Sequence, residues 1–89
     1  GGIQYGPYYS IEKGEYVVIY EGEGMGSVKF DVYSNTNDKY YSVRKVQQND
    51  SRIEYICNFD EDVKDVEFRL INESDGTVII DKITLERAE

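Results

Sequence analysis

Histidine and tryptophan are absent from the 89-residue chain, and cysteine, proline and methionine occur once each. Without histidine, neither a Ser-His-Asp triad, nor a Cys-His pair, nor a histidine-based zinc site can form. The single cysteine, Cys57, excludes an internal disulfide and a cysteine metal cluster. It stands in the alternating segment IEYICNF, where we expect a small buried apolar residue rather than a reactive thiol. We therefore predict that the chain is not an enzyme.

Long apolar runs and an excess of positive charge are also missing. No segment approaches the roughly 18–20 apolar residues of a membrane span, and no basic-then-apolar signal peptide opens the sequence. The chain has 10 basic and 18 acidic residues, a net charge of −8, so it repels polyanions at long range. We expect neither nucleic acid binding nor direct membrane insertion.

What the chain has in abundance is alternation of apolar and polar residues, in short segments separated by turn signals such as GEGMG and SNTND. Short strands spaced in this way are typical of a sandwich or barrel. The predicted strands cover residues 7–11, 15–21, 27–34, 39–47, 52–59, 65–72 and 77–86. We therefore predict an all-β fold, a jelly-roll-like antiparallel β-sandwich of about seven strands.

The length of 89 residues corresponds to one small domain. We assign residues 1–89 to a single β-sandwich domain. Within it, residues 1–4 are expected to be disordered or derived from a tag.

Alternation also assigns side chains to the two faces of each strand. In SVKFDVYS, for example, Phe30 points inward and its neighbours Lys29 and Asp31 point outward. The residues predicted to face the core are Val28, Phe30, Val32, Ile53, Tyr55, Cys57, Phe59, Val66, Phe68 and Leu70. Those predicted to face outward are Lys29, Asp31, Tyr33, Arg52, Glu54, Asn58, Glu67 and Arg69. One-faced alternation of this kind is typical of antiparallel sandwich sheets.

The segment GEYVVIY is apolar on both of its faces. Tyr16 and Tyr20 share a face with Val18, and we assign them to the core. Val17 and Ile19 lie on the opposite face and are apolar as well. Burial of the strand on both sides, or a cover formed by the N-terminal segment, would explain this pattern.

Residues 60–71 allow a second interpretation. Their apolar positions also fit one face of a helix that Asp60 could cap. Strict alternation around Phe68 favours a turn followed by a strand, which is the structure we predict.

Two stretches carry a resemblance to a known family: GPYYSIEKGEYVVIY at residues 6–20 and VEFRLINESDGTVIIDKITLE at residues 66–86. The chain resembles the jelly-roll β-sandwich modules of the carbohydrate-binding-module superfamily, and related domains appended to bacterial surface and envelope proteins. The resemblance implies a non-catalytic accessory module, extracellular or at the cell surface. It also implies a larger parent protein, whose neighbouring domain would be a partner.

The same resemblance implies a structural calcium site. In related modules a carboxylate in the region of the last strand helps to bind calcium, and Asp81 occupies that region here. Such a site would join Asp81 to Glu12 or Glu15. The alternative is that these carboxylates are solvated, and no other cofactor is predicted.

Sugar binding requires an exposed aromatic plane with polar neighbours for the hydroxyl groups. Tyr33 and Tyr40 flank the loop SNTNDK, so an antiparallel hairpin places their rings across from each other. Parity puts Asp31 beside the first ring. On the following strand it puts Ser42 and Arg44 beside the second. The predicted binding residues are Tyr33, Tyr40, Asp31, Arg44, Asn35 and Asn37.

We therefore expect weak carbohydrate binding through exposed tyrosines. The alternative is a structural or protein–protein interaction domain with no small ligand. In that case the tyrosine pair only stabilises its hairpin, or it packs on a neighbouring domain of the parent protein.

Overall fold

The computed structural model describes residues 2–72 and 76–88, and for residues 2–9 it describes the backbone alone. The strands are β1 (Gly2–Ile11), β2 (Gly14–Glu23), β3 (Val28–Ser34), β4 (Lys39–Tyr40), β5 (Ser42–Asn49), β6 (Arg52–Phe59), β7 (Val63–Asn72) and β8 (Ile79–Arg87). One turn of 3-10 helix, η1 (Met25–Ser27), joins β2 to β3. Within the described ranges there is no α-helix, and no helix is long and apolar enough to cross a membrane.

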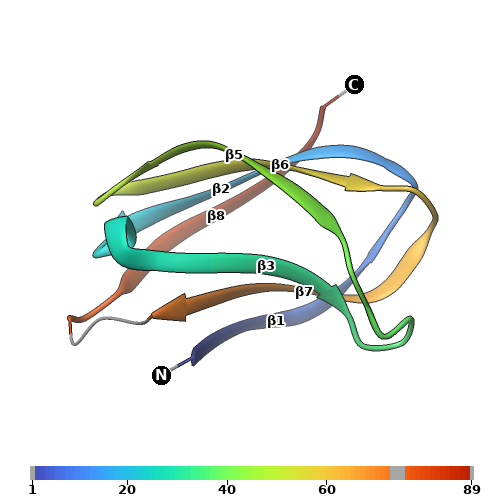
Figure 1. Cartoon of the computed structure of the whole chain (residues 1–89), viewed down its shortest axis with the longest axis horizontal. Coiled ribbons are helices and arrows are strands. Elements are labelled where there is room, and N and C mark those ends of the chain that lie inside the picture. Colours follow the sequence, from blue (N-terminus) through green and yellow to red (C-terminus); the bar gives the residue numbers. More distant parts are fainter. Residues whose placement is uncertain (1, 73–75, 89) are drawn as a thin grey trace.

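The strands form two four-stranded sheets that lie one above the other (Figure 1). The order is β1-β7-β3-β4 in one sheet and β5-β6-β2-β8 in the other, and all neighbouring strands are antiparallel. The first three strands alternate between the sheets, and so do the last three. This arrangement confirms the predicted all-β antiparallel sandwich and is compatible with a jelly-roll-like module.

Tyr41 divides the strand predicted over residues 39–47, so the sandwich has eight strands rather than seven. β4 continues the ladder with β3, whereas β5 pairs with β6 in the other sheet. Between them, the Tyr41 amide donates a hydrogen bond to the Val32 carbonyl at 3.0 Å. The buried Tyr41 ring packs on Phe59, with ring centroids 5.1 Å apart. One residue therefore carries the chain from one layer to the next.

The starts of β7 and β1 lie in two segments for which the sequence made a specific prediction. β7 begins at Val63, which confirms the turn followed by a strand and contradicts the helical alternative. Residues 2–4, expected to be disordered or tag-derived, form the first part of β1 and pair with residues 69–71 of β7. Residue 1 lies outside the described residues.

Pro7 lies in an edge strand, because β1 pairs only with β7 among the described strands. The register of this pair shifts between Tyr5 and Tyr9, on either side of the proline. Proline has no N–H to donate, so an edge position beside an irregularity is one of the few places in a sheet that accepts it.

Most of the core consists of the inner faces of both sheets, as the alternation predicted, and Met25 of η1 and Tyr41 between β4 and β5 add to it. The buried apolar residues are Ile11, Tyr16, Val18, Tyr20, Met25, Val28, Val32, Tyr41, Ile53, Tyr55, Cys57, Phe59, Val63, Val66, Phe68 and Leu70. Phe30 is partly buried against this cluster. The assignment of Tyr16 and Tyr20 to the core is therefore confirmed.

Val17 and Ile19 are half-buried on the outer face of β2. Neither explanation offered for their apolar character holds. The N-terminal strand β1 belongs to the other sheet, and β2 lies between β6 and β8 with its outer face turned away from it. Val17 and Ile19 lie on a central strand of the sheet. The flanking strands β6 and β8 therefore cover part of their side chains from either side.

Cys57 is fully buried among the inner residues of β6. Burial raises the pKa of its thiol to about 12, because the thiolate loses its hydration there. The residue behaves as a small apolar side chain, as predicted, and it carries little thiolate at neutral pH.

An aromatic cluster connects the two sheets inside the sandwich. The hydroxyl oxygens of Tyr20 and Tyr55 are 2.7 Å apart and share a hydrogen bond in a buried environment. Phe30 stacks on the ring of Tyr55, at a centroid distance of 4.4 Å and an interplanar angle of 15°. Both sheets thus meet through these rings, since Phe30 comes from β3 and the tyrosines from β2 and β6.

We predict that Tyr20→Phe lowers the free energy of unfolding by about 1–3 kcal/mol, because it removes this hydrogen bond from the buried Tyr55 hydroxyl. The double variant with Tyr55→Phe should lose less than the sum of the two single variants, because both polar groups are then absent. Urea unfolding followed by circular dichroism measures this cycle. Additive losses would show that the two hydroxyls are not coupled.

Candidate functional site

The tyrosine pair lies on the outer face of the β1-β7-β3-β4 sheet. Tyr33 of β3 and Tyr40 of β4 are direct cross-strand partners, which confirms the predicted hairpin geometry. Their ring centroids are 4.9 Å apart at an interplanar angle of 52°. Tyr33 is half-buried, whereas Tyr40 is 59% exposed, the most exposed large apolar side chain among those described. An aromatic plane therefore stands in solvent at this position.

Arg69 of β7 fixes this pair in place. Its Nε and Nη2 atoms donate to the two carboxylate oxygens of Asp31 at 2.6 and 2.9 Å, and Nη2 also donates to the Tyr40 hydroxyl at 3.0 Å. The guanidinium lies over both rings, 5.1 Å from the centroid of Tyr33 and 5.2 Å from that of Tyr40. The hydrogen bonds to Asp31, above all, raise the pKa of Arg69. A two-pronged ion pair of this kind orients the guanidinium more strictly than a single contact would.

Arg44 is not part of this cluster, contrary to the prediction. It was placed beside Tyr40 on one continuous strand, but the chain changes sheet at Tyr41. Arg44 therefore lies on β5, opposite Ile56 on the outer face of the other sheet. Arg69, which the sequence placed outward but not at the site, is the cation of the cluster. Arg69 belongs to the cluster because the register of β3 and β7 places it opposite Asp31. That register cannot be predicted from the sequence of one strand alone.

The loop between the two tyrosines is held by its own polar groups. The Tyr33 hydroxyl donates to the Asp38 carboxylate at 2.6 Å, and Asp38 has a left-handed backbone with φ of 49°. The side-chain nitrogen Nδ2 of Asn37 donates to the Tyr41 hydroxyl at 3.1 Å and to the Glu61 carboxylate at 3.3 Å. Of the two predicted asparagines, Asn37 is thus engaged in shaping the loop, whereas the Asn35 side chain is exposed and forms no described hydrogen bond.

A shallow hollow of about 250 Å³ adjoins Tyr40 where the chain passes between the sheets. Its lining residues are Lys39, Tyr40, Tyr41, Ser42, Asn58 and Asp60. Lys39 donates to both carboxylate oxygens of Asp60, at 3.3 and 3.4 Å. Ser42, predicted on the side of Tyr40, is indeed here, and Asn58 is an addition that only the pairing of β5 with β6 reveals. The exposed ring therefore has hydroxyl, amide and charged groups beside it.

Glu67 departs from its predicted exposure. It pairs with Tyr33 and so occupies an outer-face position, but its side chain is only 4% exposed. Within the described part of the chain, its Oε1 atom has no hydrogen-bond partner. Three residues of β1, at positions 6–8, stand against this single position of β7. The bulge lies beside Glu67 at the border of the tyrosine cluster.

The residues expected to bind calcium do not come together. Asp81 lies in β8 at an irregularity opposite Glu21 and Gly22, whereas Glu15 is at the other end of β2. At about 3.4 Å per residue, the six steps along the strand from Glu15 to Glu21 span roughly 20 Å. Glu12 is exposed and lies 3.6 Å from Arg87. Among the described residues, no group of three or more acidic or cysteine side chains could hold a metal ion.

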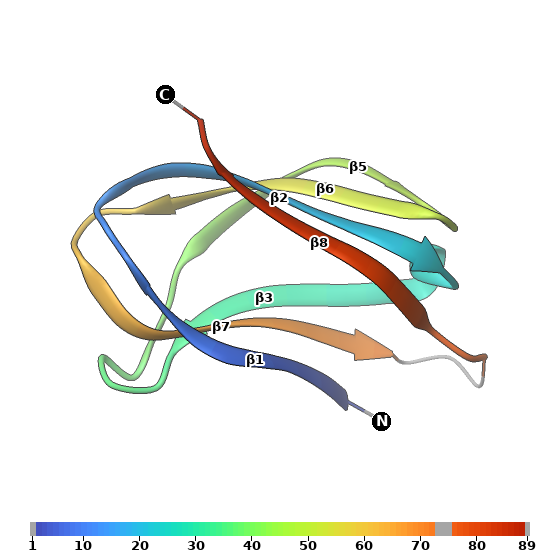
Figure 2. The same ribbon diagram turned by 180° about the vertical axis from the view of Figure 1, so that it is seen from behind.

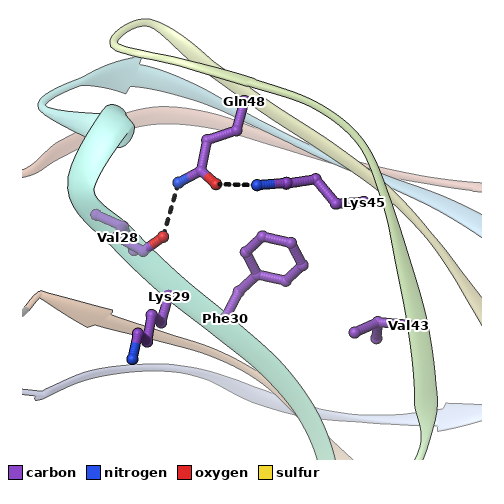
Figure 3. A pocket seen from close by; sticks show the side chains of 6 residues that line it. All are labelled: Val28, Lys29, Phe30, Val43, Lys45 and Gln48. Carbon is purple, nitrogen blue, oxygen red and sulfur yellow. Dashed lines mark hydrogen bonds between the residues drawn. The ribbon is translucent and has the colours of Figure 1, made fainter.

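A second hollow, of about 320 Å³, opens between β3 and β5 (Figure 3). Phe30 and Val43 form its apolar part, and Gln48 reaches across it to donate to the Val28 carbonyl at 2.7 Å. Lys45 lies 3.4 Å from the same amide and completes the rim. The sequence did not predict this opening. Lys45 and Gln48 are polar residues at core-facing positions of β5. Polar side chains at such positions indicate that this side of the sandwich is not closed.

Comparisons with known proteins do not assign the chain to a family. A scan against protein-family models, a search of curated proteins and a search of solved structures each found no match to the chain. What stands is an antiparallel β-sandwich that presents a tyrosine pair, fixed by an ion pair, beside a polar hollow.

The phenol of Tyr33 provides a test of this geometry. Its hydrogen bond to Asp38 is the main cause that raises the pKa of Tyr33 above the ordinary value of 10.0. We predict that Asp38→Asn lowers the pKa of Tyr33, measured by a pH titration of its ring carbon signals in NMR spectra. Stability that this bond contributes is present below the ordinary pKa and is lost as the pH rises through the raised one.

Asp50→Asn is the matched control, because that carboxylate lies in the turn between β5 and β6, away from the tyrosines. It should leave the pKa of Tyr33 unchanged. An equal pKa in the Asp38→Asn variant and in the unaltered protein would contradict the hydrogen bond.

Proposed function

We propose that this protein is a non-catalytic accessory module that binds carbohydrate weakly through the face formed by Tyr33, Tyr40, Asp31 and Arg69. The observation that carries the proposal is the Tyr40 ring, which is 59% exposed and yet held on one side by Tyr33 and Arg69. A flat ring held in advance loses little conformational freedom when it stacks on the C–H face of a pyranose.

The polar surroundings of the ring support the same proposal. Ligand sites combine apolar surface with a few polar groups that fix orientation. On one side of Tyr40 lie Arg69 and Asp31, and on the other lies the hollow with Ser42 and Asn58. Sugar hydroxyl groups both donate and accept hydrogen bonds, so carboxylate, guanidinium, amide and hydroxyl partners all suit them.

The shape of the surface favours weak binding without chemistry. The hollow of about 250 Å³ is open to solvent and is not an enclosed cavity. Such a surface suits a chain of sugars that lies across it. We place this module on a larger bacterial surface or envelope protein, a placement that rests on the resemblance of the two end segments.

A structural or protein–protein interaction domain is the second candidate function. The observation that favours it is the saturation of Arg69, whose described hydrogen bonds all go to Asp31 and Tyr40. A cluster whose members satisfy one another also serves to stabilise the β3-β4 hairpin. In that case Tyr40 packs on a neighbouring domain of the parent protein rather than on a sugar.

The test is a titration of the ¹⁵N-labelled protein with a panel of soluble oligosaccharides and polysaccharides, followed by amide chemical shifts. We expect shifts centred on Tyr33, Tyr40 and Arg69 for at least one glycan. Tyr40→Ala should weaken binding of that glycan about tenfold or more, because truncation of an aromatic anchor removes its stacking surface. Tyr40→Phe keeps the ring and should retain most of the affinity.

Val46→Ala is the matched control for loss of exposed apolar surface, because Val46 is 50% exposed on β5 in the other sheet. It should bind glycan as the unaltered protein does. If no glycan in the panel causes shifts, the result contradicts the proposal and favours the second candidate function. Shifts centred on Phe30 and Lys45 would move the site to the other hollow and contradict the proposal.

A further inference from the structure

β8 forms a free edge of the β5-β6-β2-β8 sheet. Among the described strands it pairs only with β2, and Figure 2 shows it at the near edge of the upper layer, with no further strand beyond it. Ile79 and Ile83 of this strand are 44% and 38% exposed. A long free edge with exposed apolar side chains is a template for pairing with another strand.

The backbone hydrogen bonds of β8 fix which groups face that edge. The Ala88 amide donates to the Glu15 carbonyl of β2 at 2.8 Å. In an antiparallel ladder, alternate residues turn their N–H and C=O groups to the same side. Thr84 and Glu86 therefore face β2 as Ala88 does, and Ile83 and Leu85 turn their backbone groups to the free edge.

We propose that β8 is a dimer interface, at which two copies of the chain pair their β8 strands antiparallel about a two-fold axis through Thr84. In this register Ile83 of one copy is opposite Leu85 of the other, so the two residues with outward backbone groups meet and can exchange both hydrogen bonds. A symmetric interface of this kind is closed, because each copy uses the same surface.

The charges of the strand are self-complementary in this register. Lys82 of each copy is opposite Glu86 of the other, and Thr84 is opposite its own equivalent. Neither Lys82 nor Glu86 has an ion pair within the described part of its own chain. Pairing would therefore supply each of them with an opposite charge at cross-strand distance.

The neighbouring registers that preserve the hydrogen bonds lack this match. With the axis at Ile83, Lys82 is opposite Thr84 and Ile80 is opposite Glu86. With the axis at Leu85, Thr84 is opposite Glu86 and Ile83 is opposite Arg87. Only the axis at Thr84 places charge against charge and apolar side chain against apolar side chain.

The dimer does not involve the tyrosine face, because β8 and the tyrosines belong to different sheets. It joins the two four-stranded sheets that contain β8 into one continuous sheet. Two copies of the tyrosine face would then be displayed on one particle. Paired sites of this kind raise the apparent affinity for a polymeric ligand without any new contact.

Sedimentation equilibrium of the unaltered protein, at concentrations from about 1 μM to 1 mM, is the first test. We expect a weak dimer that dissociates within this range, because a single pair of edge strands buries little surface. In the Glu86→Lys variant, Lys82 of each copy is opposite a lysine at position 86 of the other copy. This like-charge contact occurs at two places in the dimer and should raise the dissociation constant at least about tenfold. The double variant Lys82→Glu with Glu86→Lys restores opposite charges and should recover the dimer.

Glu15→Lys is the matched control, because it makes the same change of charge on the outer face of the neighbouring strand β2. It should dimerise as the unaltered protein does. Hydrogen exchange gives a second measurement: the Ile83 and Leu85 amides should become more protected as concentration rises, and the Glu86 amide, already bonded to β2, should not change. A monomer mass at every concentration, or a dimer that Glu86→Lys does not weaken, would overturn the proposal.

Discussion

The passage of the chain through Tyr41 determines most of what this sandwich presents to solvent. The residue has to satisfy two demands at once: its ring is buried on Phe59, and its amide remains bonded to the Val32 carbonyl of the sheet that the chain is leaving. These two contacts hold β4 to a length of two residues and start β5 in the opposite layer. Because the Tyr41 ring is buried on one sheet and its backbone amide is bonded to the other, the chain has few other routes between the two sheets.

The tyrosine cluster follows from that crossing. Because β4 ends at Tyr40, its ring stands at the margin of the sheet and is open to solvent, and the hollow lined by Ser42 and Asn58 forms where the layers part. On the inner margin, Arg69 donates to the hydroxyl of the same ring and is itself held by Asp31. One half of the ring environment is therefore rigid and internally satisfied, and the other half is open and polar. A surface built in this way is ordered before any ligand arrives.

Alternation of side chains sufficed to predict the strands and most of the core, but not buried Met25 of η1 and not the partners at the site. The period of two determines whether a residue points in or out, and it held for Tyr20, Cys57 and Leu70 alike. It carries no information on which sheet a strand joins. For this reason Arg44 was correctly placed outward yet on the wrong face, and Arg69 was placed outward without its role.

Contacts that depend on register were equally out of reach. The separation of Asp81 from Glu15 follows from the pairing of β8 with β2, and the burial of Glu67 accompanies a bulge in β1. Neither has a local signature in the residues themselves. The resemblance to carbohydrate-binding modules implied a carboxylate site on the strength of one strand, and long-range pairing decided against it.

The edges of the two sheets are protected in different ways, and the difference is itself informative. β1 has Pro7 and a three-residue bulge, β4 is two residues long, and β5 directs Lys45 and Gln48 toward the open side of the sandwich and has its own irregularity at Val46. Each of these devices opposes pairing with another chain. β8 has a bulge only near its start, and from Lys82 to Arg87 its ladder with β2 is regular. An edge left straight in a fold whose other edges are all interrupted is the one at which a further strand can be added without rearrangement of the sheet.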